Sequence, residues 1–161
     1  MPICRRLLCL LLAVLPVLAF AQAGPLTIKH VYIGWREAAS FKRISEYFSG
    51  QENTHGEAML RTHPDQRGGF YFLVRVSNPG PARAIKVALH VITSGNARPT
   101  DYHFSTELKA GGETVLNLGL TGEDWTDSKG NPVAWKLDLT AGEGQLLASE
   151  TSYLWEKPAT Q

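Results

Sequence analysis

Short segments in which apolar and polar residues alternate constrain the fold of this chain more than any other feature of it. The clearest of them carries apolar residues at every second position: Val133, Trp135, Leu137 and Leu139. Residues 85–91 and 116–120 repeat the pattern. Because successive side chains of a strand point to opposite faces, each segment predicts a strand with one buried and one solvated face.

Residues 70–76 are apolar on nearly both faces, which predicts a central strand. This run ends at the turn sequence Ser-Asn-Pro-Gly-Pro of residues 77–81. Weaker strand patterns occupy four further segments: residues 26–35, 58–62, 102–108 and 146–155. Seven to eight short strands separated by turn residues predict an all-β fold, or a mainly β fold with one short helix, arranged as a two-sheet antiparallel sandwich.

The segment 37–48 has a different pattern. Four large apolar residues have helical spacing: Phe41, Ile44, Tyr47 and Phe48. Gly50 follows them at the position where a helix C-cap is expected. The same segment also fits a strand with Phe41 and Tyr47 on one face, so the sequence leaves helix and strand open. We expect residues 36–68 to form a less regular elaboration on the sandwich.

The first residues have the three parts of a secretory signal. Arg5 and Arg6 precede an apolar stretch over residues 7–20, and small residues then offer cleavage after Ala21 or Ala23. The apolar stretch is shorter than the roughly 20 residues that span a bilayer as a helix. We expect cleavage after Ala21, export to the periplasm or the exterior, and no stable membrane insertion afterwards.

Loss of residues 1–21 from the 161-residue chain would leave 140 residues, enough for a single domain over 22–161. Both cysteines, Cys4 and Cys9, leave with the signal, so the mature domain can form no internal disulfide. Lys plus Arg falls from 16 to 14 against 15 Asp plus Glu, and no basic run is present. This balance predicts that the domain has no nucleic-acid partner.

The order of turns and strands resembles that of immunoglobulin-like domains common in exported bacterial proteins. The resemblance rests on Asn78-Pro79-Gly80 before one period-two strand, and on the turn at 108–113 that leads into 115–118. It covers residues 69–155. It implies an adhesion, assembly or spacer module without catalytic activity, although such folds host many functions.

Residues that could bind a metal or perform catalysis are sparse. His55 and His63 lack the spacing of metal ligands, and the acidic loop 122–131 lacks the pattern of a calcium loop. We therefore expect no metal and no cofactor. A hydrolase would have to use carboxylates from one segment: Glu46, Glu52 and Glu57.

Two loops are candidate interaction surfaces. In the first, Asp124, Trp125 and Asp127 are close together, and Trp125 could stack on a sugar ring or fold back as a plug over the end of the sandwich. Trp35 is a second candidate for sugar stacking. We favour the plug.

The second loop carries Arg61, His63 and Arg67 just before the most apolar strand. Its arginines could bind a carboxylate or phosphate, or pair with Glu46, Glu52 or Glu57 to hold the irregular segment on the sandwich. We favour this internal pairing. The sequence as a whole predicts a non-catalytic module that contacts another protein through a loop patch or an exposed sheet edge. A carbohydrate-binding domain is the alternative, and a hydrolase the third hypothesis.

Overall fold

A computed structural model of the chain describes residues 24–54, 56–142 and 144–156. The predicted signal, residues 1–21, lies outside this range. In the described residues, no helix has the length and apolar character needed to cross a membrane.

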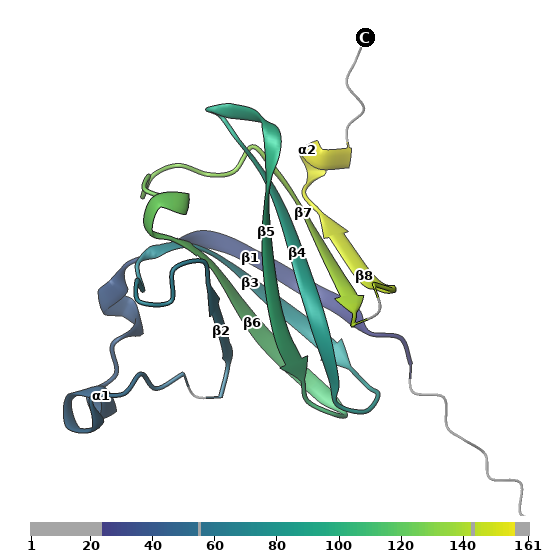
Figure 1. Ribbon diagram of the computed structural model, residues 1–161, viewed down its shortest axis with the longest axis horizontal. Helices are drawn as coiled ribbons and strands as arrows, with labels where there is room; N and C mark the ends of the chain where they lie inside the picture. The colour runs from purple at the N-terminus through teal and green to yellow at the C-terminus, as the bar shows by residue number, and fades with distance from the viewer. Residues whose placement is uncertain (1–23, 55, 143, 157–161) are drawn as a thin grey trace, which may run out of the picture.

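Eight strands form two four-stranded sheets packed face to face (Figure 1). Sheet A contains, in spatial order, β1 (Thr27–Arg36), β3 (Gly69–Asn78), β6 (Gly112–Thr121) and β2 (Ala58–Arg61). Sheet B contains β5 (Asn96–Leu108), β4 (Arg83–Thr93), β7 (Ala134–Ala141) and β8 (Leu146–Thr151). The predicted two-sheet sandwich is thus confirmed.

The expectation that all strands pair antiparallel is wrong for β2, which lies parallel to β6. The reason is the path of the chain. The loop 62–68 turns β2 directly into β3, and β3 runs antiparallel to β6. Because β2 and β6 both run opposite to β3, they share a direction.

The core lies between the sheets, where the predicted period-two faces meet. From β3 it receives Phe70, Phe72, Val74 and Val76, all at most 1% exposed. Trp135, Leu137 and Leu139 of β7 face the core as predicted, but Val133 does not. Val133 precedes the strand and is 43% exposed, and its backbone N–H donates to the Ile92 carbonyl.

The segment between β1 and β2 is helical, so the strand alternative for residues 37–48 is wrong. A 3-10 helix spans Ala38–Phe41, and α1 spans Ile44–Ser49. Gly50 ends α1 in the left-handed conformation, with φ of 67°, as the C-cap pattern predicts. The predicted strand 146–155 ends early at Thr151, and the short helix α2 (Tyr153–Glu156) follows.

Candidate functional site

Residues 37–54 pack against the outer face of sheet A, where Phe41 covers Tyr71 of β3. The Phe41 ring packs on the Tyr71 ring with centroids 4.8 Å apart, and Tyr71 is 0% exposed. Gly119 of β6 makes room for this ring. A Cβ atom on Gly119 would lie 2.6 Å from Tyr71 Cε1, closer than van der Waals contact allows.

Arg61, the last residue of β2, ties this segment to the sheet. Its guanidinium donates two hydrogen bonds to the Glu52 carboxylate, at 2.6 and 2.8 Å, and its Nε donates to Tyr71 Oη at 2.8 Å. Tyr71 Oη in turn donates to the Arg67 carbonyl at 2.7 Å. The hydrogen bonds from Arg61 lower the pKa of Glu52, whereas burial raises the pKa of Tyr71.

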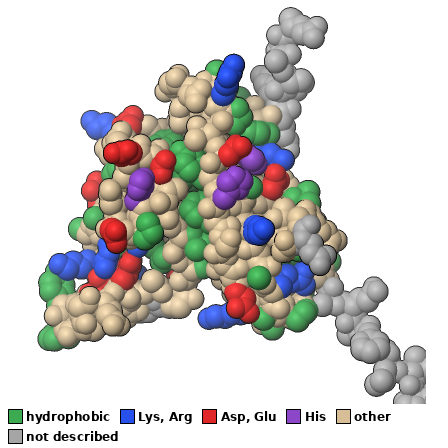
Figure 2. Space-filling view, in the orientation of Figure 1, with side chains coloured by type: hydrophobic (Ala, Val, Ile, Leu, Met, Phe, Trp, Pro, Cys, Tyr) green, Lys and Arg blue, Asp and Glu red, His purple; other side chains and the backbone are tan. Residues whose placement is uncertain are grey.

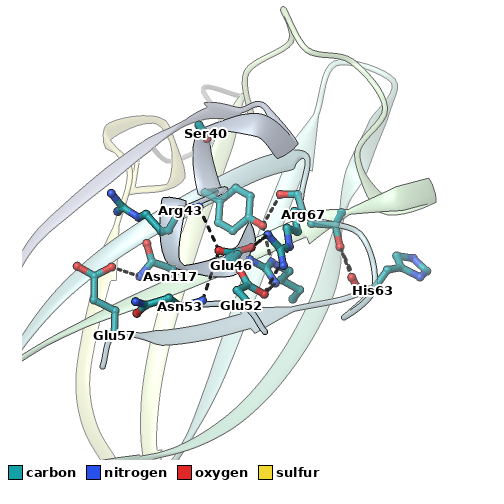
Figure 3. A network of polar contacts seen from close by, with 12 residues as sticks. Ser40, Arg43, Glu46, Glu52, Asn53, Glu57, His63, Arg67 and Asn117 are labelled. Carbon is teal, nitrogen blue, oxygen red and sulfur yellow. Dashed lines mark hydrogen bonds and ion pairs between the residues drawn. The ribbon is translucent and has the colours of Figure 1, made fainter. Parts of the chain in front are cut away.

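Glu46 of α1 makes the second ion pair of the network (Figure 3). Arg67 Nη1 donates to Glu46 Oε2 at 2.6 Å, and the backbone N–H groups of Arg43 and Asn53 donate to Glu46 Oε1. The bond from Arg67 is the largest influence that lowers the pKa of Glu46. The favoured internal pairing is therefore confirmed for Glu46 and Glu52. The third carboxylate that the sequence offered, Glu57, accepts a hydrogen bond from Asn117 of β6 instead.

The structure brings Glu46 and Glu52 together around Arg67, whose Nε lies 3.7 Å from Glu52 Oε2. A glycoside hydrolase needs one carboxyl group with a raised pKa to protonate the leaving group. Both carboxyl groups here have lowered pKa values and are bonded to arginine. The arrangement is suited to holding residues 37–54 in place, because both carboxylates are ion-paired with arginine side chains.

The two predicted interaction loops meet at one end of the sandwich. His63 Nε2 lies 3.2 Å from Asp124 Oδ2, and the His63 backbone N–H donates to Thr121 Oγ1 at 3.0 Å. Thr121 Oγ1 donates back to the His63 carbonyl at 3.1 Å. Loop 62–68 and the loop after β6 therefore form one continuous surface.

Trp125 is the plug that the sequence analysis favoured, and the idea that its ring stands open for sugar stacking is wrong. It is 8% exposed, its ring lies 4.5 Å from the Phe70 ring, and its Nε1 donates to the Asp127 carbonyl. Asp127 is itself engaged, because its carboxylate accepts from the Lys129 N–H. Trp35 is partly buried against the core, with its Nε1 bonded to Glu37. A hollow of about 220 Å³ beside Trp125 is lined by Asp124 and Asp127.

A larger groove of about 440 Å³ lies between β2 of sheet A and β5 of sheet B. Its lining contains both apolar and polar residues: Glu52, Thr54, Met59, Leu60, Arg61, Pro64, Phe104 and Ser105. This groove was not predicted from the sequence. No sequence signal could reveal it, because the β2–β5 approach depends on how the two sheets stack.

No metal site is evident in the described part of the chain, where no three His, Cys, Asp or Glu side chains converge. The nearest arrangement is on the outer face of sheet B. There Asp101 contacts His90 Nδ1 at 2.6 Å, and Asp138 lies 3.7 Å from His90 Nε2. The two carboxylates lie at opposite ring nitrogens, so they do not surround a common point.

Comparison with known proteins adds no relative: no protein-family model, no curated protein and no solved structure matches this chain.

Proposed function

We propose that this chain is a non-catalytic protein-binding module, which takes up an extended segment of a partner protein in the groove between β2 and β5. The observation that supports it is an open strand edge beside a preformed groove. The predicted N-terminal signal supports a partner in the cell envelope or outside the cell.

The open edge belongs to β2, which pairs only with β6 among the described strands. The Thr62 N–H donates to the Gly119 carbonyl of β6. Backbone groups of a strand alternate sides, so those of Met59 and Arg61 point away from β6. They are available to a strand added from a partner, which is a common mode of peptide recognition.

Besides the open strand edge, peptide recognition needs a surface of fixed shape that distinguishes one partner from another. The side chains that line the groove form this surface. Met59, Leu60 and Phe104 give it apolar walls. The Arg61 side chain is 5% exposed and is held by Glu52 and Tyr71, so the side chain is already ordered before a partner binds. A preformed site loses less entropy when a partner binds. The best-fitting partner segment is extended, with an apolar side chain directed between Leu60 and Phe104.

The test is the variant Met59→Pro. Proline removes an N–H that points away from β6 and that donates to no group in the described residues. The probe is a phage-displayed library of random peptides panned on the purified chain. We expect selected peptides to bind with micromolar Kd, to slow amide exchange at Met59 and Arg61, and to bind Met59→Pro at least about tenfold more weakly.

Met59→Ala is the matched control, since it shortens the side chain but keeps the N–H. It should bind the selected peptides far better than Met59→Pro does. A library that yields no binder, or peptides that bind the proline variant as well as the original chain, would overturn the proposal.

A further inference from the structure

We propose that the α1 lobe, defined as residues 38–51, docks peripherally on an anionic phospholipid surface. The helix α1 of this lobe stands away from the strands at the lower left of Figure 1, and Figure 2 shows hydrophobic side chains in this region. Three large apolar side chains of α1 face solvent: Ile44 is 79%, Tyr47 70% and Phe48 87% exposed. This site is separate from the β2–β5 groove, and the proposal does not depend on peptide binding there.

The exposure of these side chains is built into the fold. Glu46 lies on the same helix but points inward, with its side chain 6% exposed and bonded to Arg67. Phe41, just before α1, is buried on Tyr71. With Glu46 and Phe41 anchored on the sheet side, the face that carries Phe48 is held outward.

The charges of the lobe favour a negatively charged partner. Lys42 and Arg43 are exposed, and Glu46 is the only acidic residue between positions 38 and 51. Arg67 neutralises Glu46, and exposed Glu37 lies with Arg43 around one hollow beside the lobe. The exposed groups Lys42, Arg43 and Glu37 therefore leave a net charge of +1 beside the apolar side chains. The Lys42 ammonium lies 4.4 Å from the Tyr47 ring centroid, so cation and aromatic ring form one surface.

The size and chemistry of this surface favour lipid over protein. A six-residue helix with three apolar side chains is small beside the roughly 800 Å² per partner of a standard protein interface. Self-association of two lobes is unfavourable, because it would place Lys42 and Arg43 of one copy next to the same cations of the other copy. Aromatic and aliphatic groups flanked by Lys and Arg fit the interfacial region of a bilayer, where anionic headgroups attract the cations.

The experiment places a polarity-sensitive dye on the lobe of the full chain. Gln51→Cys is labelled with a nitrobenzoxadiazole dye after Cys4 and Cys9 are changed to Ser. Vesicles of phosphatidylcholine alone are compared with vesicles containing roughly 30% phosphatidylglycerol. We expect a blue shift only with the anionic vesicles, and no shift for a dye at Gly95→Cys in the β4–β5 turn. The local dye separates lobe docking from any binding by residues 7–20.

Two variants test the cause of the shift. Phe48→Ser should weaken the apparent vesicle affinity of the lobe about tenfold, and the double variant Lys42→Glu/Arg43→Glu should weaken it by at least about tenfold. Tyr153→Ala removes an equally exposed aromatic of α2, and Lys86→Glu reverses an exposed charge on β4; both should leave the shift intact.

Three results would overturn the proposal. The first is an unchanged emission wavelength of the dye at position 51 when anionic vesicles are added. The second is a shift without vesicles that grows with protein concentration, which would assign the lobe to a second copy of the chain. The third is a blue shift with anionic vesicles that is unchanged in Phe48→Ser and also unchanged in Lys42→Glu/Arg43→Glu.

Discussion

Arg67 Nη1 donates a 2.6 Å hydrogen bond to Glu46 Oε2, and this bond joins α1 to the loop that enters β3. The two residues are 21 positions apart in the chain. The neighbouring pair, Arg61 and Glu52, fixes one wall of the β2–β5 groove. One network of ion pairs therefore positions both the α1 lobe and the groove, although the two surfaces are separate. In Figure 2, acidic and basic side chains gather where the lobe meets the sandwich.

Replacing Arg61 should destabilise the fold, because it leaves Glu52 and the Tyr71 hydroxyl without their shared donor. We expect Arg61→Met to lower the free energy of unfolding by about 2–3 kcal/mol, below the full value for a buried pair since Glu52 is 24% exposed. Urea denaturation measures the loss. Arg75→Met is the control: Arg75 and Glu113 are each 50% exposed, so that change should cost under about 1 kcal/mol. Equal losses for the two variants would contradict a special role for Arg61.

Acid should loosen the packing of residues 37–54 on sheet A. Glu46 and Glu52 have lowered pKa values in the folded protein, so their contribution to stability is present above the carboxyl pKa of the unfolded chain, 4.5. It is lost as pH falls below 4.5 through the lower pKa values of the folded state. We expect amide exchange in α1, relative to that in β3, to increase between about pH 5 and pH 3, after correction for the intrinsic rate.

The double variant Glu46→Gln/Glu52→Gln supplies the comparison for this acid effect. It cannot titrate at these positions, so its α1 exchange should already be raised at about pH 5 and should change less toward pH 3. If the variant and the original chain show the same pH profile, the ion pairs are not what holds α1 in place.

Trp125 should matter for stability rather than for carbohydrate binding. Trp125→Ala removes a ring packed on Phe70 and leaves a cavity at the end of the core, with an expected cost of about 3–4 kcal/mol. Thermal or urea unfolding measures it. The 80% exposed Tyr153 provides the control, since Tyr153→Ala should change stability by less than about 0.5 kcal/mol. A Trp125→Ala protein as stable as the original chain would show that the ring is not a structural plug.

Local pattern predicted the strands whose residues alternate between a buried and a solvated face, such as β4 and β7. It did not predict the exposed first part of β5, residues 96–101, or the end of β8 at Thr151. The arginine pairing was predictable from charge, since a few carboxylates lay near Arg61 and Arg67 in the chain. The pairing of Glu57 with Asn117 was not, because those residues meet only when β2 lies beside β6.

The groove and the lobe could not be predicted for a different reason. Both depend on which surfaces remain uncovered after the sheets have stacked. The spacing of Ile44, Tyr47 and Phe48 indicates a helical face, but it does not tell whether another element covers that face. In the structure, Glu46 and Phe41 fix one side of the lobe to the sandwich, so the opposite face of α1, which carries the three apolar side chains, remains exposed to solvent.

Two glycines on either side of Tyr71 offer the sharpest test of how the outer face of sheet A is packed. Gly34 of β1 and Gly119 of β6 both pair with Tyr71 across the sheet. A Cβ on Gly119 would press on the Tyr71 ring at 2.6 Å, whereas a Cβ on Gly34 would meet nothing within 4 Å. We expect Gly119→Ala to lower the free energy of unfolding by about 1–3 kcal/mol.

Gly34→Ala should instead be neutral or slightly stabilising, because alanine restricts the unfolded chain without a clash in the folded one. Neither glycine has a positive φ, so backbone strain does not separate the two variants. The added methyl group of Gly119→Ala would displace the ring and pull Tyr71 Oη away from Arg61 and from the Arg67 carbonyl. Amide exchange in α1 should therefore rise in Gly119→Ala and stay unchanged in Gly34→Ala. Equal stability of the two variants would show that the Tyr71 ring has room to move, and that the network does not depend on its position.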